Sequence, residues 1–200
     1  PLLQPYYDLA KLMRRGMVFS TTATWIFRAG PLVTLATVLL AGLLVPIGGE
    51  AAPVSFAGDM ILFAYLFGLA RFFTTAAALD TGSAFEGMGA AREATFACLS
   101  EPTLFFGLLV LARRAGSLTL STMLHPPPGS LAEGGAAPLV LVGIGLFIVL
   151  LAETCRIPVD DPATHLELTM IHEVMVLDHS GPLFGLILYA AAVKLLVLGS

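Results

Sequence analysis

The sequence predicts an all-α, polytopic integral membrane protein with about five transmembrane helices, and three observations lead to this fold class. Hydrophobic residues make up 57% of the 200-residue chain and charged residues only 12%. Soluble domains contain roughly 45–50% apolar residues and about 25% charged residues. The apolar residues are concentrated in long runs that carry few charges. Segments rich in glycine and proline separate these runs, as connections between helices require. Lipid is therefore the expected solvent for most of the chain.

Each apolar run is close to the length of a membrane span, since about 20 mostly apolar residues cross roughly 30 Å of hydrocarbon. The fourth run is the clearest, because "APLVLVGIGLFIVLLA" (137–152) contains no charge. The third is the least regular, because Glu101 and Pro102 interrupt it. We expect helices at residues 30–47, 59–79, 95–112, 138–152 and 183–199, joined by turns at 46–53, 80–93 and 125–138.

The opening segment, residues 1–29, is expected to lie on the cytoplasmic side as an amphipathic segment. Its stretch "YYDLAKLMRR" places Tyr6, Tyr7 and Leu9 among basic residues, which favours a helix in the membrane interface. If the chain crosses the membrane five times, the opening segment and the loop 153–182 lie on the same side. That side carries most of the basic residues. Because cytoplasmic loops of membrane proteins are enriched in Lys and Arg, both segments are predicted to face the cytoplasm. The expected cytoplasmic basic residues are Lys11, Arg14, Arg15, Arg28, Arg92 and Arg156, and the opposite side has Arg113 and Arg114.

Several function classes are disfavoured by composition and spacing. The net charge of -4 and the absence of basic runs argue against nucleic-acid binding. Cys98 and Cys155 have no partner at metal-ligand spacing and are expected to be small buried packing residues. The glycines at 82, 87 and 89 do not follow a strand, so they indicate a flexible turn instead of a phosphate-binding loop. No catalytic residue and no metal ligand is expected in this chain.

Ionisable residues inside the apolar runs are the main functional candidates, because each costs at least ~2.5–3.5 kcal/mol in hydrocarbon unless protein or water surrounds it. Glu101 is the strongest candidate, since Pro102 loosens the turn before it and a desolvated carboxyl there could hold and release a proton. The alternative is a structural ion pair with Arg71 or Arg92. Arg71 needs a pairing partner near the middle of its helix, and Lys194 is either a relay residue or a side chain that snorkels to the interface.

A dense group of charges follows the fourth run in "ETCRIPVDDPATHLEL" (153–168). Glu153 is expected to pair with Arg156 across one helical turn. Pro158 and Pro162 exclude a regular helix between them, so the loop should be ordered, with its carboxylates held by arginine and backbone donors. The charges that are expected to face a partner are Arg156, Asp160, Asp161, His165, Glu167 and His172.

A helix is expected to restart after Asp161 or Pro162 and to include "THLELTMIHEVMVLD" (164–178). The histidines at 165, 172 and 179 would then lie along one helix face, with neighbouring rings about 10 Å apart, too far to share a metal. Apolar residues alternate with the charges in this stretch. Such a pattern favours burial of the segment against a partner protein.

Three stretches carry a family resemblance: "LLQPYYDLAKLMRR" (2–15), "GAAREATFACLSEP" (89–102) and "AETCRIPVDDPATHLELTMIHEVMVLDHSGP" (152–182). They resemble the integral-membrane subunit of formate hydrogenlyase and hydrogenase-4 type complexes, which is similar to subunit 1 of respiratory complex I. The resemblance implies an antiporter-like five-helix unit in a fragment that lacks the first helix and the C-terminus. It also implies a proton-coupling subunit that docks a peripheral nickel–iron hydrogenase arm.

The partners implied by the resemblance are the hydrogenase large and small subunits, an iron–sulfur protein and antiporter-like membrane subunits. The nickel–iron site and the iron–sulfur clusters would belong to those partners. In the complex I relative, a motif of the form E-T-N-R-x-P-F-D-L-P-E-A-E-x-E-L lines the quinone cavity. The matching positions are Glu153, Thr154, Arg156, Pro158, Asp160, Pro162, Glu167 and Leu168, and Arg92 and Glu101 match an Arg followed nine residues later by a helix Glu.

Departures from that motif favour the hydrogenase branch over a quinone site, because they fall in the loop beside the quinone cavity. Cys155, Val159, Asp161, Ala163 and His165 replace its Asn, Phe, Leu and two carboxylates. Two alternatives stay open: a quinone-site subunit of an NADH:quinone oxidoreductase, and an ion-coupled secondary transporter that would use the same intramembrane charges. Under the first hypothesis, the proton-coupling residues are Glu101, Arg92, Glu153, Arg71 and Lys194.

Overall fold

The computed structural model describes residues 3–48, 50–125, 137–160 and 170–200. Across these ranges all regular elements are helices and no strand occurs, which confirms the all-α fold class. Four of the helices found there, α2, α3, α4 and α9, are long and apolar enough to cross a membrane, and α6 is shorter, with 17 residues. The helices are α1 (Gln4–Met13), α2 (Trp25–Leu44), α3 (Asp59–Asp80), α4 (Ala84–Ala115), α5 (Leu120–Leu124), α6 (Ala137–Glu153), α8 (His172–Met175) and α9 (Gly181–Gly199).

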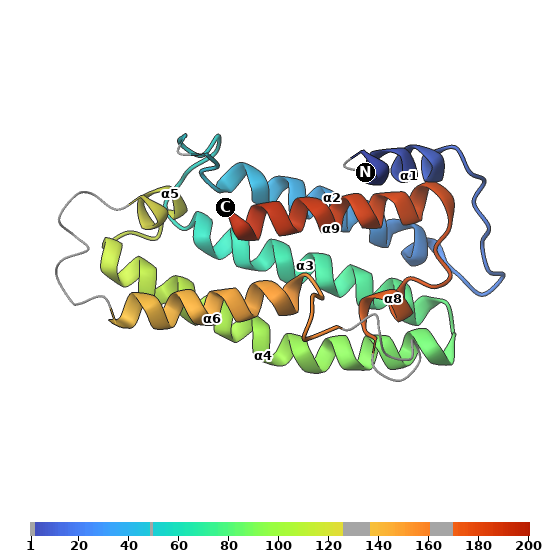
Figure 1. Ribbon diagram of the computed structural model, residues 1–200. Coiled ribbons are helices and arrows are strands. Elements are labelled where there is room, and N and C mark those ends of the chain that lie inside the picture. Colours follow the sequence, from blue (N-terminus) through green and yellow to red (C-terminus); the bar gives the residue numbers. More distant parts are fainter. Residues whose placement is uncertain (1–2, 49, 126–136, 161–169) are drawn as a thin grey trace.

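The long helices lie side by side in one bundle (Figure 1). Helix α2 packs on α3 and α9, and α4 packs on α3, α6 and the short α8. A continuous apolar core joins the five long helices, with Val38 of α2, Phe67 of α3, Leu108 of α4, Val149 of α6 and Val197 of α9 among its buried members. Because hydrophobic burial does not drive helix association in lipid, close packing and polar contacts must hold these helices together.

The two ends of the bundle are built from different parts of the chain. Figure 1 shows α1, α8, the start of α2 and the connection from α3 to α4 at one end, and α5 and the C-terminus at the other. Helix α1 packs on α9 through Leu9, Leu12 and Met13, which approach Gly185. This arrangement brings residues from both halves of the sequence to the end that contains α1.

Helix α4 begins at Ala84, eleven residues before the predicted start at 95, so the predicted turn at 80–93 is wrong beyond Ser83. Gly89 explains the error, because a Cβ there would lie 3.0 Å from Met175 Cγ and 3.1 Å from the Ile171 carbonyl oxygen. This glycine permits close contact with the segment at α8 instead of forming a turn. Pro102 remains inside α4, and Figure 1 shows the helix changing direction near its middle.

Helix α2 begins at Trp25, five residues before the predicted start. The Thr24 side chain caps it by accepting a hydrogen bond from the Ile26 N–H at 3.3 Å. The Asp80 carboxylate at the end of α3 accepts the Thr24 N–H at 2.6 Å and the Thr24 hydroxyl at 2.8 Å. The last residues of the predicted segment 1–29 therefore belong to the first membrane-spanning helix.

The predicted helix over 164–178 is wrong in its described part, where only His172–Met175 is helical. His172 lies on α8 and His179 follows it in the connection to α9, so the expected alignment of the histidines on one helix face does not occur; His165 lies outside the described residues. The expected burial of Cys98 is wrong, because this residue is exposed, whereas Cys155 is half-buried.

Candidate functional site: a buried ion cluster

Four helices of the bundle, α3, α4, α6 and α9, contribute charged side chains to one cluster, with Arg71 of α3 at its centre. Arg71 Nε lies 2.9 Å from Glu93 Oε1, and Nη1 lies 3.2 Å from Glu101 Oε1; both glutamates are on α4. Arg71 Nη2 contacts Oε1 of Glu153, the last residue of α6. The second carboxylate oxygen of Glu153 lies 2.8 Å from Lys194 Nζ on α9. We call these five residues the ion cluster.

Burial differs within the ion cluster. The side chain of Glu153 is 1% exposed and that of Arg71 7%, whereas the Glu101 side chain is 46% exposed. Ser100 adds a hydroxyl that accepts from Arg71 Nη1 at 3.1 Å and donates to Glu153 Oε1 at 3.2 Å. Because removal of one partner would leave a buried charge uncompensated, the ionised members depend on one another.

The sequence builds this cluster by helical spacing. Glu93 and Ser100 are seven residues apart on α4, so they lie two turns apart on one face of that helix. That face packs on α3 and α6, which carry Arg71 and Glu153. Lys194 reaches Glu153 from α9 and also lies 5.6 Å from the centre of the Phe67 ring.

A cavity of about 80 Å³ lies against the ion cluster and extends toward α2. Its lining includes Arg71, Glu93, Glu153 and Lys194 together with Thr34 and Thr74, whose hydroxyls are 3.0 Å apart. A cavity of this size has room for several water molecules, and the charged and hydroxyl groups in its lining offer them hydrogen-bond partners. Carboxylates, hydroxyls and water in contact can pass protons or respond to a change in nearby charge.

Two residues outside the spans, Cys155 and His172, line the same cavity from the end that contains α8. Burial, together with the Glu93 carboxylate, raises the pKa of the Cys155 thiol to about 12, so the thiol stays protonated. Burial, followed by repulsion from Lys194, lowers the pKa of His172. Both side chains are therefore neutral at physiological pH and add no net charge to the cavity.

The structure brings together four of the five predicted proton-coupling residues: Arg71, Glu101, Glu153 and Lys194. Arg92 instead donates from Nη1 to the Met170 carbonyl oxygen at 2.8 Å and holds the segment before α8. Sequence reasoning missed Glu93 because residues up to 93 were assigned to a turn, and it missed Ser100, inside the predicted helix 95–112, because only ionisable residues were considered there. Their spacing of seven residues, with Glu86 seven residues earlier, is the signal that could have revealed a polar helix face.

The charged loop has a structural role in its described part. Asp160 is buried, and its Oδ2 accepts the backbone N–H groups of Ile171 at 3.2 Å and His172 at 3.0 Å. This agrees with the expected backbone donors. The predicted pairing of Glu153 with Arg156 is wrong, because the chain leaves α6 through Cys155 at φ +48° and Glu153 turns to Arg71 and Lys194. Asp161, His165 and Glu167 lie outside the described residues.

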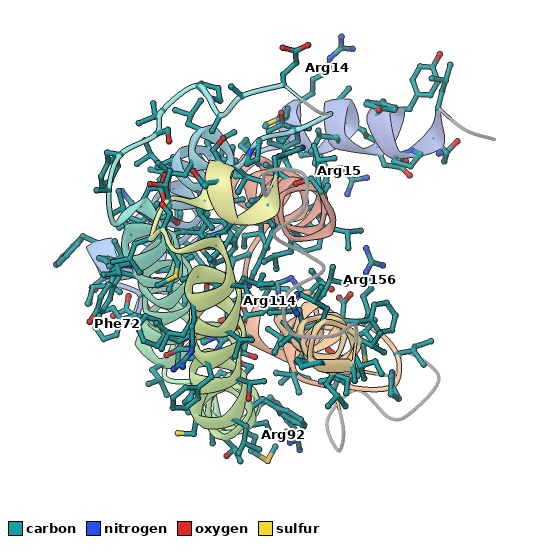
Figure 2. The ribbon with its side chains drawn as sticks, turned by 90° about the vertical axis from the view of Figure 1, so that its left-hand side faces the viewer. Arg14, Arg15, Phe72, Arg92, Arg114 and Arg156 are labelled. Carbon is teal, nitrogen blue, oxygen red and sulfur yellow. The ribbon has the colours of Figure 1, made fainter. Side chains whose placement is uncertain are left out.

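Arg156 is exposed, and its side chain points out of the bundle (Figure 2). It lines a surface cavity of about 370 Å³ together with Cys155, Asp160 and His172. Because Cys155 and His172 line both this cavity and the one at the ion cluster, they separate the surface from the buried charges. Across residues 3–48, 50–125, 137–160 and 170–200, no group of three or more His, Cys, Asp and Glu side chains converges to hold a metal.

The fold and the site together define a multi-pass helical membrane protein with a cluster of ion pairs in its interior. The family model described as NADH dehydrogenase matches residues 1–200, and the chain belongs to this family. It is 34% identical over 200 residues to "Formate hydrogenlyase subunit 4" and 35% identical over 203 residues to "Hydrogenase-4 component C", both of Escherichia coli (strain K12). These matches confirm the resemblance on which the sequence analysis relied.

The matches cover 98% of this chain but only 62% and 61% of the two curated relatives, so the chain spans about three fifths of their length. Among solved structures, a chain of the membrane-bound sulfane sulfur reductase (MBS), an archaeal respiratory membrane complex, matches with a TM-score of 0.81 at 21% identity. That match covers 99% of this chain and 64% of the other. At this identity it supports the fold alone.

Proposed function

We propose that this chain is the membrane-anchoring, proton-coupling subunit of a membrane-bound nickel–iron hydrogenase of the formate hydrogenlyase or hydrogenase-4 type. The observation that carries the proposal is the ion cluster, a set of charges held inside a membrane bundle beside a cavity that the charged side chains line. Such charges are costly in lipid and are typical of proton pathways. The names of the two relatives support the hydrogenase assignment.

The end of the bundle that contains α8 is the proposed docking face for the peripheral arm. Arg156 and Glu173 are exposed there, next to the cavity bounded by Cys155 and His172. A change of charge or geometry at a docked arm would act first on the residues around this cavity. It would then act on Lys194 and Glu153, which lie behind Cys155 and His172. The partners are the hydrogenase large and small subunits, an iron–sulfur protein and antiporter-like membrane subunits. Those partners would carry the nickel–iron and iron–sulfur groups.

The test is a Glu101→Gln variant of the full complex in inverted inner-membrane vesicles. Glutamine keeps the shape of the side chain but neither carries the charge nor releases a proton. We expect assembly and dye-linked hydrogenase activity to persist, while proton translocation falls by a factor of roughly 100 or more. Glu50→Gln, an exposed glutamate outside the ion cluster, is the matched control. Unchanged proton translocation in the Glu101 variant would refute the coupling role.

A quinone-site subunit of an NADH:quinone oxidoreductase is the second candidate. The description of the matching family model and the surface cavity of about 370 Å³ favour it. A photoreactive quinone added to the purified complex separates the two proposals. Labelling of the peptide that contains Cys155 and Arg156, prevented by excess natural quinone, would support the second candidate and displace the first.

A further inference from the structure

A groove between α3 and α4 opens on the membrane-facing side of the bundle and reaches the ion cluster. Its volume is about 370 Å³. Glu101 lies in it with its side chain 46% exposed, and the buried Glu153 also lines it. The remaining lining is mainly apolar and includes Tyr65, Phe67, Gly68 and Cys98. We call this feature the α3–α4 groove.

The α3–α4 groove lies within the spans. Tyr65 and Gly68 fall inside Asp59–Asp80, and Glu101 falls inside Ala84–Ala115. Figure 2 shows Phe72 projecting outward from α3, and Tyr65, two turns earlier on the same face of that helix, is 72% exposed. What covers this face is therefore lipid or another membrane segment.

The ion cluster is not neutral when its members are ionised. Among the described residues it contains two cations, Arg71 and Lys194, and three carboxylates, Glu93, Glu101 and Glu153. The most exposed carboxylate faces the groove, so the surplus negative charge is directed toward its occupant. An acyl chain offers neither a positive charge nor a hydrogen-bond donor to a carboxylate.

The shape of the groove suits a helix. Ala64 and Gly68, four residues apart on α3, and Ala97 and Cys98 on α4 line it with small side chains. Small residues let the backbones of two membrane helices approach closely, so that a side chain from the second helix can reach a group inside the first bundle. Many helices would fit the groove by shape alone. The negative charge of Glu101 favours a helix that carries a basic side chain.

We propose that the α3–α4 groove is the docking site for a transmembrane helix of a partner subunit that presents a basic side chain to Glu101. This inference rests on the proposed function only in requiring a membrane complex with more than one subunit. The docked helix neutralises the surplus charge, and it separates Glu153 from lipid. It would thereby close the ion cluster against uncontrolled exchange with the bilayer.

The test replaces Tyr65 with the photoreactive residue p-benzoylphenylalanine in the full complex in native membranes. Irradiation is expected to join residue 65 to an apolar segment of another subunit that contains a Lys or Arg within its span. Adducts only with phospholipid, or only with this chain itself, would overturn the proposal. Crosslinking does not depend on proton coupling. It can therefore fail while the Glu101→Gln variant still supports the proposed function, and it can succeed while that variant refutes it.

A second measurement uses the native thiol in the groove. The chain has two cysteines, so Cys155→Ser leaves Cys98 as its single thiol. In that background, Glu101→Lys should repel the basic partner and raise the rate at which N-ethylmaleimide labels Cys98 by roughly tenfold, equivalent to about 1.4 kcal/mol of docking free energy. Changing the crosslinked basic residue to Glu should restore protection. Equal labelling rates in all three complexes would exclude a docked cation.

Discussion

Arg71 holds the ion cluster together, because its three donor nitrogens contact carboxylates on both α4 and α6. A planar guanidinium offers several donors in fixed directions, whereas a lysine ammonium is a single compact point of charge. Arg71→Lys should leave at least one buried carboxylate uncompensated. The expected loss is about 3–5 kcal/mol, which is typical when one member of a buried pair is removed.

The thermal midpoint of the purified complex in detergent measures this loss. Arg113→Lys is the matched control, because Arg113 is exposed near the end of α4. The control should melt with the wild type and Arg71→Lys well below both. Coinciding midpoints for the two variants would mean that the cluster does not depend on guanidinium geometry.

His179 should make the connection between α8 and α9 sensitive to acid. Its ring stacks on Phe27 with centroids 4.0 Å apart, and burial lowers the pKa of His179 from 6.5 to about 4. The folded chain therefore binds a proton less readily than the unfolded chain. Stability is complete above pH 6.5 and is lost as the pH falls from 6.5 toward 4, by about 1.4 kcal/mol for each unit of pKa difference.

The measurement is the thermal midpoint between pH 7 and pH 4 for the wild type and for His179→Phe, which keeps an aromatic ring against Phe27. The pKa of His172 is also lowered, but that group is present in both proteins and cancels in the comparison. The wild type should lose stability on acidification more steeply than His179→Phe. Parallel curves would show that His179 does not titrate in this range.

At the scale of single elements, α4 shows what local patterns can and cannot predict. Glycine-rich segments usually indicate turns, so residues up to 93 were not expected to be helical. In the fold, Gly89 meets the segment at α8, and this contact involves residues more than 80 positions away. Long-range packing overrides the local preference here. Glu93 lies in the first turns of α4, so the local pattern did not place it on a helix.

Gly89 and Gly87 provide a matched pair that tests this explanation. A Cβ at Gly89 would press on Met175 and on the Ile171 backbone, whereas a Cβ at Gly87 meets nothing within 4 Å. Gly89→Ala should destabilise the protein by about 1–3 kcal/mol through overpacking. Gly87→Ala should be neutral or stabilising by about 0.5–1 kcal/mol, because alanine is favoured inside a helix.

Thermal unfolding of both variants under one condition measures the difference. A lower midpoint for Gly89→Ala alone is the expected outcome. If Gly87→Ala were equally destabilising, the defect would come from altered chain flexibility and not from contact with α8.

At the scale of the whole molecule, hydropathy predicted the membrane helices because lipid imposes length and polarity limits that each span must meet on its own. The ion cluster was predictable only in part. Arg71, Glu101 and Lys194 stood out because each is costly in its own helix. The pairing of Glu153 with Arg71 and Lys194 joins residues 82 and 41 positions apart, and no local pattern encodes which helices meet. The pairing of Glu153 was accordingly assigned to its near neighbour Arg156.

The distribution of basic residues over the two ends of the bundle predicts its orientation in the membrane. The end that contains α1 and the start of α2 holds Lys11, Arg14, Arg15 and Arg28, while Arg113 and Arg114 lie at the end of α4. Because basic residues are retained on the cytoplasmic side, we expect the α1 end to face the cytoplasm.

Two exposed residues report on the two ends: Thr21 precedes α2, and Ser55 lies between α2 and α3. In a background without native cysteines, a membrane-impermeant maleimide added to intact spheroplasts should label Ser55→Cys at once and Thr21→Cys only after permeabilisation. Ser55 is a suitable external reporter because it lies at the end of the bundle opposite the proposed docking face. The opposite labelling order would place α8 and Arg156 outside the cell, where no cytoplasmic hydrogenase arm could reach them, so this simple measurement bears directly on the proposed function.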